Sequence, residues 1–127
     1  MARGLTFDTG VLVALERRDR RARAIWDAAL ADGVRVTVPS AVVLEWWRNQ
    51  RGPAARIVDR VSVEPLSLAL ARIAGGALAA CGRGPSIVDA VVVASAAQRG
   101  DLVYTSDVDD LERVRDVAFP AVRILGV

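Results

Sequence analysis

Short apolar segments alternate with amphipathic stretches along the chain, and this alternation predicts strands and helices in turn. Strands are expected where four or five residues are mostly apolar or β-branched, at 5–8, 34–38, 62–66, 102–105 and 121–125. Helices are expected at 9–18, 19–33, 41–50, 53–61, 68–80, 86–99 and 108–116. Strands separated by helices need crossover connections, so the pattern favours a mainly parallel sheet with helices on both faces.

Capping signals mark where several of these helices begin. Asp19 and Ser40 each precede a helical pattern and are expected to act as N-caps. Ser86 with Asp89, and Ser106 with Asp109, fit the capping box, in which a hydroxyl and an acid three residues later each accept a backbone N–H. The runs 90–94 and 102–104 are apolar on every side, as expected of elements buried between two layers.

Length and composition limit the class of protein. At 127 residues the chain is expected to form one domain, 1–127. No apolar run approaches the roughly 18 residues that span a bilayer, and the start of the chain lacks a secretion signal, so a cytoplasmic protein without membrane contact is expected. Cys81 is the single cysteine, which excludes a disulfide framework, and it is expected to be a small packing residue.

Two residue types are missing, and each absence excludes chemistry. There is no histidine, which excludes Ser-His-Asp and Cys-His catalysis and every histidine-ligated metal site. All 17 basic residues are arginine, so a phosphate-binding loop that ends in Gly-Lys-Ser/Thr is excluded as well. Carboxylates and hydroxyls remain for acid–base or metal chemistry.

Four carboxylates have the placement of a site: Asp8, Glu45, Asp89 and Asp107. Asp8 and Asp107 follow predicted strands, at the sheet edge where open α/β folds build their sites. Carboxylates that converge repel one another unless a cation joins them, and oxygen ligands suit Mg²⁺ or Mn²⁺. The four acids therefore indicate metal-assisted chemistry on a phosphate.

Each acid also has a purely structural interpretation. Asp8 could cap the helix that follows it, and Asp89 could serve only in its capping box. Glu45 could form a surface pair with Arg48, which lies three residues further along on the same helix face as Asn49.

The motifs around these acids resemble those of PIN-domain ribonucleases, and their order and spacing resemble the VapC-type toxins of bacterial toxin–antitoxin pairs. The likeness covers almost the whole chain. It rests on four short segments: Phe7-Asp8-Thr9 before an apolar helix, Pro39-Ser40 ahead of Glu45, Ile87-Val88-Asp89-Ala90, and Tyr104-Thr105-Ser106-Asp107.

The resemblance implies a three-layer α/β/α PIN-like fold in which the four acids form one pocket. It implies that Asp8 and Asp89 bind Mg²⁺ directly and that Glu45 and Asp107 complete the pocket. It further implies endonucleolytic cleavage of single-stranded RNA by metal-activated water, a cognate antitoxin and a homodimer. Residues expected to contact substrate are Thr9, Thr105 and Arg48.

Other features leave alternatives open. The arginines of 17–23 could bind RNA phosphates, although a solvated helix face is favoured, and Arg48, Arg51, Arg56 and Arg60 form a second candidate row. Of Trp46 and Trp47, one is expected inside and the other at an interface. Residues 82–85 are interpreted as a helix stop and turn. The alternative functions are another metal-dependent phosphohydrolase and a non-enzymatic nucleic-acid- or protein-binding α/β module.

Overall fold

The computed structural model describes residues 3–48 and 52–127, which are organised around one five-stranded sheet. The strand order is β3-β2-β1-β4-β5, and every neighbouring pair is parallel. The strands are β1 (Leu5–Phe7), β2 (Val36–Pro39), β3 (Ser62–Glu64), β4 (Leu102–Thr105) and β5 (Ile124–Gly126). The expected parallel sheet is confirmed, and the last strand begins later than predicted because residues 120–121 form a turn.

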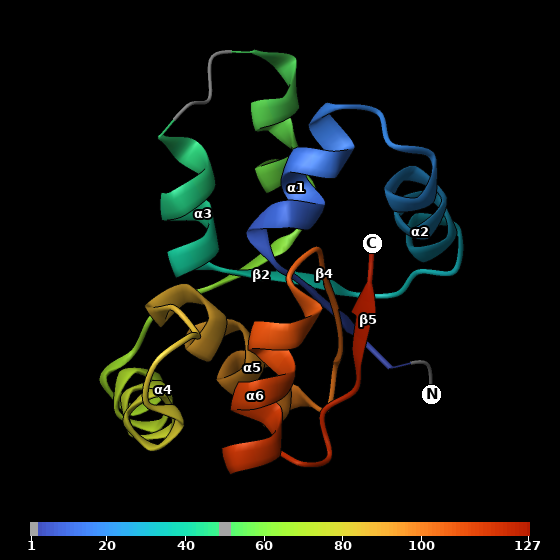
Figure 1. Cartoon of the computed structure of the whole chain (residues 1–127). Coiled ribbons are helices and arrows are strands. Elements are labelled where there is room, and N and C mark those ends of the chain that lie inside the picture. The colour runs from blue at the N-terminus through green and yellow to red at the C-terminus, as the bar shows by residue number, and fades with distance from the viewer. Residues whose placement is uncertain (1–2, 49–51) are drawn as a thin grey trace.

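Helices cover both faces of this sheet, as the alternation predicted. They are α1 (Thr9–Glu16), α2 (Arg20–Ala31), α3 (Ser40–Trp47), the 3₁₀ helix η1 (Pro53–Arg60), α4 (Leu68–Cys81), α5 (Ile87–Arg99) and α6 (Val108–Ala118). Figure 1 shows α1 and α2 on one side of the sheet and α4, α5 and α6 on the other, which gives the three-layer α/β/α arrangement. None of the helices within 3–48 and 52–127 is both long and apolar enough to cross a membrane.

The direction in which strands are added reverses at β1. After β1 the chain adds β2 and then β3 on one side of it. After α4 and α5 it adds β4 on the other side of β1. Phe7 of β1 pairs with Tyr104 of β4, so the two strands end side by side. A crevice forms outside the carboxyl ends of strands at such a reversal, because the following helices leave toward opposite faces.

The core lies between the sheet and the helices on each face. Phe7, Leu12, Val103 and Leu111 are among the largest side chains that are almost fully buried. Residues 89–96 of α5 are all buried, which confirms the interpretation of its apolar run. Helix α5 is therefore held firmly under the sheet, and its N-terminus carries Asp89 to the edge of the crevice.

The two tryptophans of α3 differ as neighbours on a helix should. Trp46 is 3% exposed and packs in the core, whereas Trp47 is 48% exposed. The indole Nε1 of Trp46 donates a hydrogen bond to the carboxylate of Glu16, which ties α3 to the end of α1. The expectation that one tryptophan lies inside is confirmed, and the interface role of the other stays a prediction.

The capping predictions are partly confirmed and partly wrong. Asp19 accepts a hydrogen bond from Ala22 N, and Ser86 with Asp89 forms the complete capping box. Ser40 is not an N-cap, because it lies inside α3 and its hydroxyl accepts from Leu66 N instead. The second capping box is also absent, since the N-cap of α6 is Asp107, which makes no side-chain cap hydrogen bond.

The remaining predictions concern the turns and the end of α3. Gly82 ends α4 with a φ of 71°, which confirms the helix stop, and Cys81 packs partly buried against the core. The predicted continuation of α3 through Asn49 and Gln50, and the position of Arg51, lie outside the described residues.

A partly buried ionic network lies at the opposite end of α5 from Asp89. The guanidinium of Arg99 donates to Glu64 Oε2 at 2.7 Å, to Asp101 Oδ2 at 2.9 Å and to the hydroxyl of Thr6 at 2.8 Å. Because these partners belong to β3, β1 and the start of β4, the network fixes the end of α5 beneath three strands. It stabilises the helix that positions Asp89.

Candidate active site

Asp8 lies at the carboxyl end of β1 and is held by two short hydrogen bonds. Its Oδ1 accepts from Thr9 N at 2.7 Å, and its Oδ2 accepts from the hydroxyl of Thr105 at 2.7 Å. The side chain is 5% exposed, and this burial raises its pKa despite both hydrogen bonds, with Glu45 and Asp107 adding to the rise. Asp8 therefore caps α1 and also contributes charge to the site, so the two interpretations coexist.

Asp89 lies near the start of α5, and its side chain lines the same crevice as Asp8. Its Oδ2 accepts from Ser86 N at 2.8 Å, and its own N–H donates to Ser86 Oγ at 3.1 Å. Burial is the main cause that raises the pKa of Asp89, and repulsion from Asp8 and Asp110 raises it further. The capping box holds one carboxylate oxygen, while the charge of the group acts on the other acids of the crevice.

Asp107 follows β4 and is free to face the crevice. Its backbone N–H donates to the hydroxyl of Thr105 at 2.9 Å, while its carboxylate caps nothing. Partial burial raises the pKa of Asp107, and the neighbouring charges of Asp89 and Asp110 raise it as well. Its carboxylate therefore lies among like charges, and in the part of the chain that the structure describes no ion pair offsets them.

Asp110 joins the site although the sequence interpretation did not include it. Carboxylate oxygens of Asp89, Asp107 and Asp110 all lie within 4.8 Å of one another. Asp107 and Asp110 are three residues apart at the start of α6, which places them on the same face of the helix. That spacing could have identified Asp110, but the capping-box pattern indicated Asp109, which is exposed.

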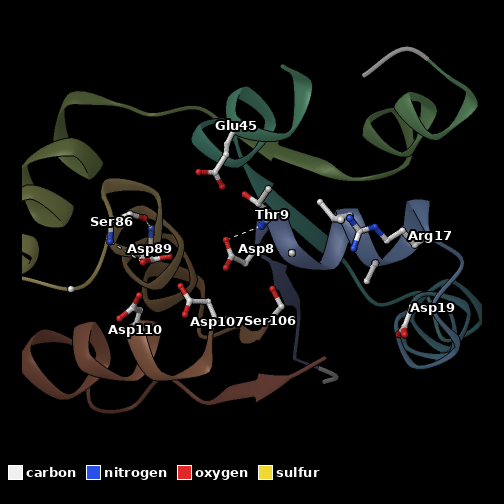
Figure 2. A pocket seen from close by; sticks show the side chains of 14 residues that line it. Asp8, Thr9, Arg17, Asp19, Glu45, Ser86, Asp89, Ser106, Asp107 and Asp110 are labelled. Carbon is white, nitrogen blue, oxygen red and sulfur yellow. Dashed lines mark hydrogen bonds between the residues drawn. The ribbon is translucent and has the colours of Figure 1, made fainter. Parts of the chain in front are cut away.

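Glu45 approaches from α3 on the opposite side of the crevice. Figure 2 shows its carboxylate directed toward Asp8 from α3, with Asp107, Asp89 and Asp110 beyond. Within the described residues no ion pair joins Glu45 to Arg48, so a Glu–Arg surface pair is not what holds this side chain. Asn49 lies outside the described residues.

The threonines expected to contact substrate have different positions. Thr105 is fully buried, and its hydroxyl donates to Asp8 and accepts from the backbone N–H of Asp107, so it supports the two acids from beneath. Thr9 lines the cavity, and its Oγ1 is buried without a hydrogen-bond partner among the described residues. Arg48 does not line the acidic cavity but lines a second one beside it.

The acids surround a cavity of about 650 Å³ at the reversal of strand order. Figure 2 shows the acidic side chains converging on it from four elements of the fold. Its charged and hydroxyl lining residues are Asp8, Thr9, Arg17, Asp19, Glu45, Ser86, Asp89, Ser106, Asp107 and Asp110. The predicted convergence of Asp8, Glu45, Asp89 and Asp107 in one pocket is what the geometry gives.

A close approach of backbone and side chain closes one wall of the cavity. A Cβ added to Gly10 would overlap Ser106 Oγ and would lie 2.8 Å from Ser106 Cβ. Because glycine leaves this space free, the start of α1 packs directly against the segment that carries Asp107. The pair Gly10 and Ser106 thus sets how near Asp8 and Asp107 come.

These residues fit a hard divalent cation. Mg²⁺ binds oxygen ligands at about 2.1 Å in octahedral geometry, so oxygens within a few ångströms of one another can share one ion. Asp89, Asp107 and Asp110 meet that condition. Within 3–48 and 52–127, none of the five acids Asp8, Glu45, Asp89, Asp107 and Asp110 forms an ion pair with an arginine, so no ion pair neutralises their charge.

Comparisons with known proteins agree with this architecture. A family model described as PIN domain matches residues 5–117. Among curated proteins, none matches the chain.

Solved structures share the fold at low sequence identity. VapBC from Salmonella typhimurium, bound to DNA, superposes with a TM-score of 0.72 at 18% identity, over 98% of this chain and 98% of that chain. VapBC2 from Rickettsia felis, bound to a DNA fragment from its promoter, gives 0.72 at 12%, over 97% and 98%. VapC20 from Mycobacterium tuberculosis, described as a sarcin–ricin loop cleaving toxin, gives 0.62 at 21%, over 82% and 92%.

Proposed function

The chain belongs to the PIN-domain family, and on that basis we propose that it is a Mg²⁺-dependent endoribonuclease that cuts single-stranded RNA. The observation that carries the proposal is the convergence of Asp8, Glu45, Asp89, Asp107 and Asp110 on one cavity at the reversal of strand order, with no ion pair to any of these five carboxylates within the described residues. Helix capping alone does not account for the carboxylates of Glu45 and Asp107, because Glu45 lies inside α3 and the side chain of Asp107, the N-cap residue of α6, makes no cap hydrogen bond.

Asp89, Asp107 and Asp110 would hold the ion, with Asp8 beside them as the further ligand implied by the family motif. When bound, Mg²⁺ (or Mn²⁺) supplies charge neutralisation at the phosphate and lowers the pKa of water. Asp8 offers lone pairs beyond those used by Thr9 and Thr105, since a carboxylate has about four acceptor sites. Glu45 lies across the cavity from these acids and would orient water or hold a second ion.

Side chains of this protein would accept the proton that the attacking water loses. Without histidine or lysine, the proton lost by the attacking water passes to a carboxylate oxygen or to solvent. Because the pKa values of Asp8, Asp89 and Asp107 are raised, these groups accept a proton at a higher pH than an ordinary aspartate does. Attack by water, with the 3′-oxygen leaving, would give a 5′-phosphate and a 3′-hydroxyl.

RNA is favoured as substrate by one structural relative. VapC20 of Mycobacterium tuberculosis is described as cleaving the sarcin–ricin loop, an RNA element. A metal site held by carboxylates contacts a phosphate and not a base. The choice of RNA would therefore depend on the surface around the cavity.

The partners proposed are a cognate antitoxin and a second copy of the chain. The Salmonella and Rickettsia relatives are described as VapBC complexes on DNA, which supports a toxin that is neutralised by an antitoxin. Leu44 and Trp47 of α3 are 72% and 48% exposed and offer an apolar surface to such a partner. Both roles would be carried out in the cytoplasm, where the RNA is.

Expression in growing bacteria tests the proposal. Inducing the wild-type chain should stop growth and create new RNA 5′-phosphate ends at defined positions, whereas Asp8→Asn should do neither. Arrested growth without new ends, or the same ends with the variant, would show that the chain acts in another way.

A further inference from the structure

A second cavity continues the acidic one along α1 and α3. It has a volume of about 440 Å³ and shares Thr9, Val13, Arg17 and Glu45 with the acidic cavity. Its other lining residues are Glu16, Trp46 and Arg48. Because four residues line both spaces, the two form one groove that leads away from the acids.

The groove changes its charge along its length. The four aspartates of the site line the first cavity alone, Arg17 and Glu45 line both cavities, and Arg48 lines the second alone. Arg17 and Arg48 follow the last turns of α1 and α3. Figure 2 shows Arg17 projecting from α1 on the side of Thr9 opposite Asp89 and Asp107. Cations are favoured at helix C-termini, where the backbone dipoles place partial negative charge.

Both guanidinium groups are available for a ligand. Arg17 and Arg48 are exposed, and within the described residues neither is paired with a carboxylate. Their neighbour Glu16 is occupied by the indole N–H of Trp46. Of the arginines at 17–23, Arg17 is the one that lines the acidic cavity; Arg23 lines a different cavity between α2 and η1.

We propose that Arg17 and Arg48 bind RNA phosphates that flank the cleaved one on one side, so that the groove between α1 and α3 sets the path of the strand. The inference rests on the proposed ribonuclease function and adds the residues that position the substrate. A guanidinium matches a phosphate with two parallel hydrogen bonds, and phosphate contacts fix register without reading sequence. The acids repel the same strand unless a cation is present, so the arginines would supply the attraction that the cavity lacks.

Binding without cleavage provides the first test. A 5′-fluorescent single-stranded RNA of 12 nucleotides is titrated with protein in EDTA and followed by anisotropy at several salt concentrations. Arg17→Ala and Arg48→Ala should each weaken binding by about tenfold and lower the slope of log K against log salt by about 0.7, the value for one single-strand phosphate contact. Arg17→Lys should recover part of the loss.

Arg21→Ala is the matched control, because it removes the same charge from an exposed residue of α2 that lines neither cavity of the groove. It should change affinity and slope much less. In Mg²⁺, Arg17→Ala should raise KM for the RNA while kcat changes little, since the chemistry at the acids is intact.

The outcomes separate the two proposals. Equal effects of Arg17→Ala and Arg21→Ala on binding, with wild-type cleavage intact, would overturn the groove and leave the nuclease standing. A wild-type protein that neither binds nor cuts RNA would overturn both. A fall in kcat with unchanged KM would show that Arg17 acts on the acids and not on the strand.

Discussion

The hydroxyl of Thr105 lies 2.7 Å from Asp8 Oδ2 and donates a hydrogen bond to it. The same hydroxyl accepts from Asp107 N at 2.9 Å, so one fully buried side chain at the end of β4 positions acids on two neighbouring strands. Its donation favours the charged form of Asp8 and opposes the effect of burial on the pKa. Thr105 therefore helps to keep a carboxylate ionised where burial would neutralise it.

Thr105→Val keeps the shape of the side chain and removes this hydrogen bond. We expect the pKa of Asp8 to rise further, and the free energy of unfolding to fall by about 1–3 kcal/mol because two buried polar groups lose a partner. Metal-dependent cleavage should need a higher pH. Chemical denaturation and a pH–rate profile measure the two effects, and an unchanged profile would show that the hydrogen bond does not govern Asp8.

Asp89 has two roles that two substitutions can separate. Asp89→Asn keeps an oxygen that can accept from Ser86 N and loses the charge, so cleavage should vanish while stability in EDTA is kept or slightly raised. Asp89→Ala loses the cap as well, which should cost about 0.5–2 kcal/mol. Thermal or urea unfolding of both variants checks this. If both variants were equally destabilised, the charge of Asp89 would be stabilising the fold, contrary to this account.

Asp110 is expected to bind the ion together with Asp89 and Asp107. Asp110→Asn should raise the Mg²⁺ concentration for half-maximal cleavage by about tenfold or more, in the range seen when groups around a metal are changed. Asp109→Asn is the control, since Asp109 is an exposed neighbour outside the group of three. Titration of activity with Mg²⁺ tests the pair; equal shifts would mean that only general charge matters.

Stability without metal should depend on pH through the same acids. The pKa values of Asp8, Asp89 and Asp107 are raised, chiefly by burial and further by repulsion. Between the ordinary aspartate value of about 3.9 and the raised values, the folded chain binds more protons than the unfolded chain, so these groups lower the unfolding free energy as pH rises.

Other carboxylates titrate in the same range, so the quantity to measure is the difference between wild type and the double variant Asp8→Asn/Asp107→Asn in EDTA. The variant should gain stability relative to wild type as pH rises toward neutrality. Mg²⁺ at a hundred times its Kd should stabilise wild type at neutral pH by about 2.7 kcal/mol. A difference that is flat with pH, or no stabilisation by Mg²⁺, would argue against an uncompensated acidic site.

The sequence was sufficient for the architecture because its signals are local and strong. Apolar runs at 5–7 and 102–105, separated by amphipathic helices, require crossovers and hence a parallel sheet. The acids at positions 8 and 107 were located for the same reason, since Asp8 directly follows β1 and Asp107 comes two residues after the end of β4. Asp89 was more ambiguous, and the structure gives it both a cap and a place in the cavity.

What the sequence left out depends on contacts between distant segments. Ser40 has the local signal of an N-cap, yet its hydroxyl accepts from Leu66, a residue of the segment that follows β3. Asp110 joins Asp89 only because α5 and α6 lie together under the sheet. Arg17 is one of five similar arginines in sequence, and only the packing of α1 beside α3 distinguishes it.

The central claim is that the five acids form a metal-dependent ribonuclease site. The most direct measurement incubates purified chain with total bacterial RNA and a defined single-stranded pool, in Mg²⁺, Mn²⁺ or EDTA, and sequences the new 5′ ends. Cleavage should leave 5′-phosphates, need either metal, and be lost in Asp8→Asn and in Glu45→Gln. RNA that stays intact with both metals, or cleavage that persists in EDTA or in the variants, would contradict it.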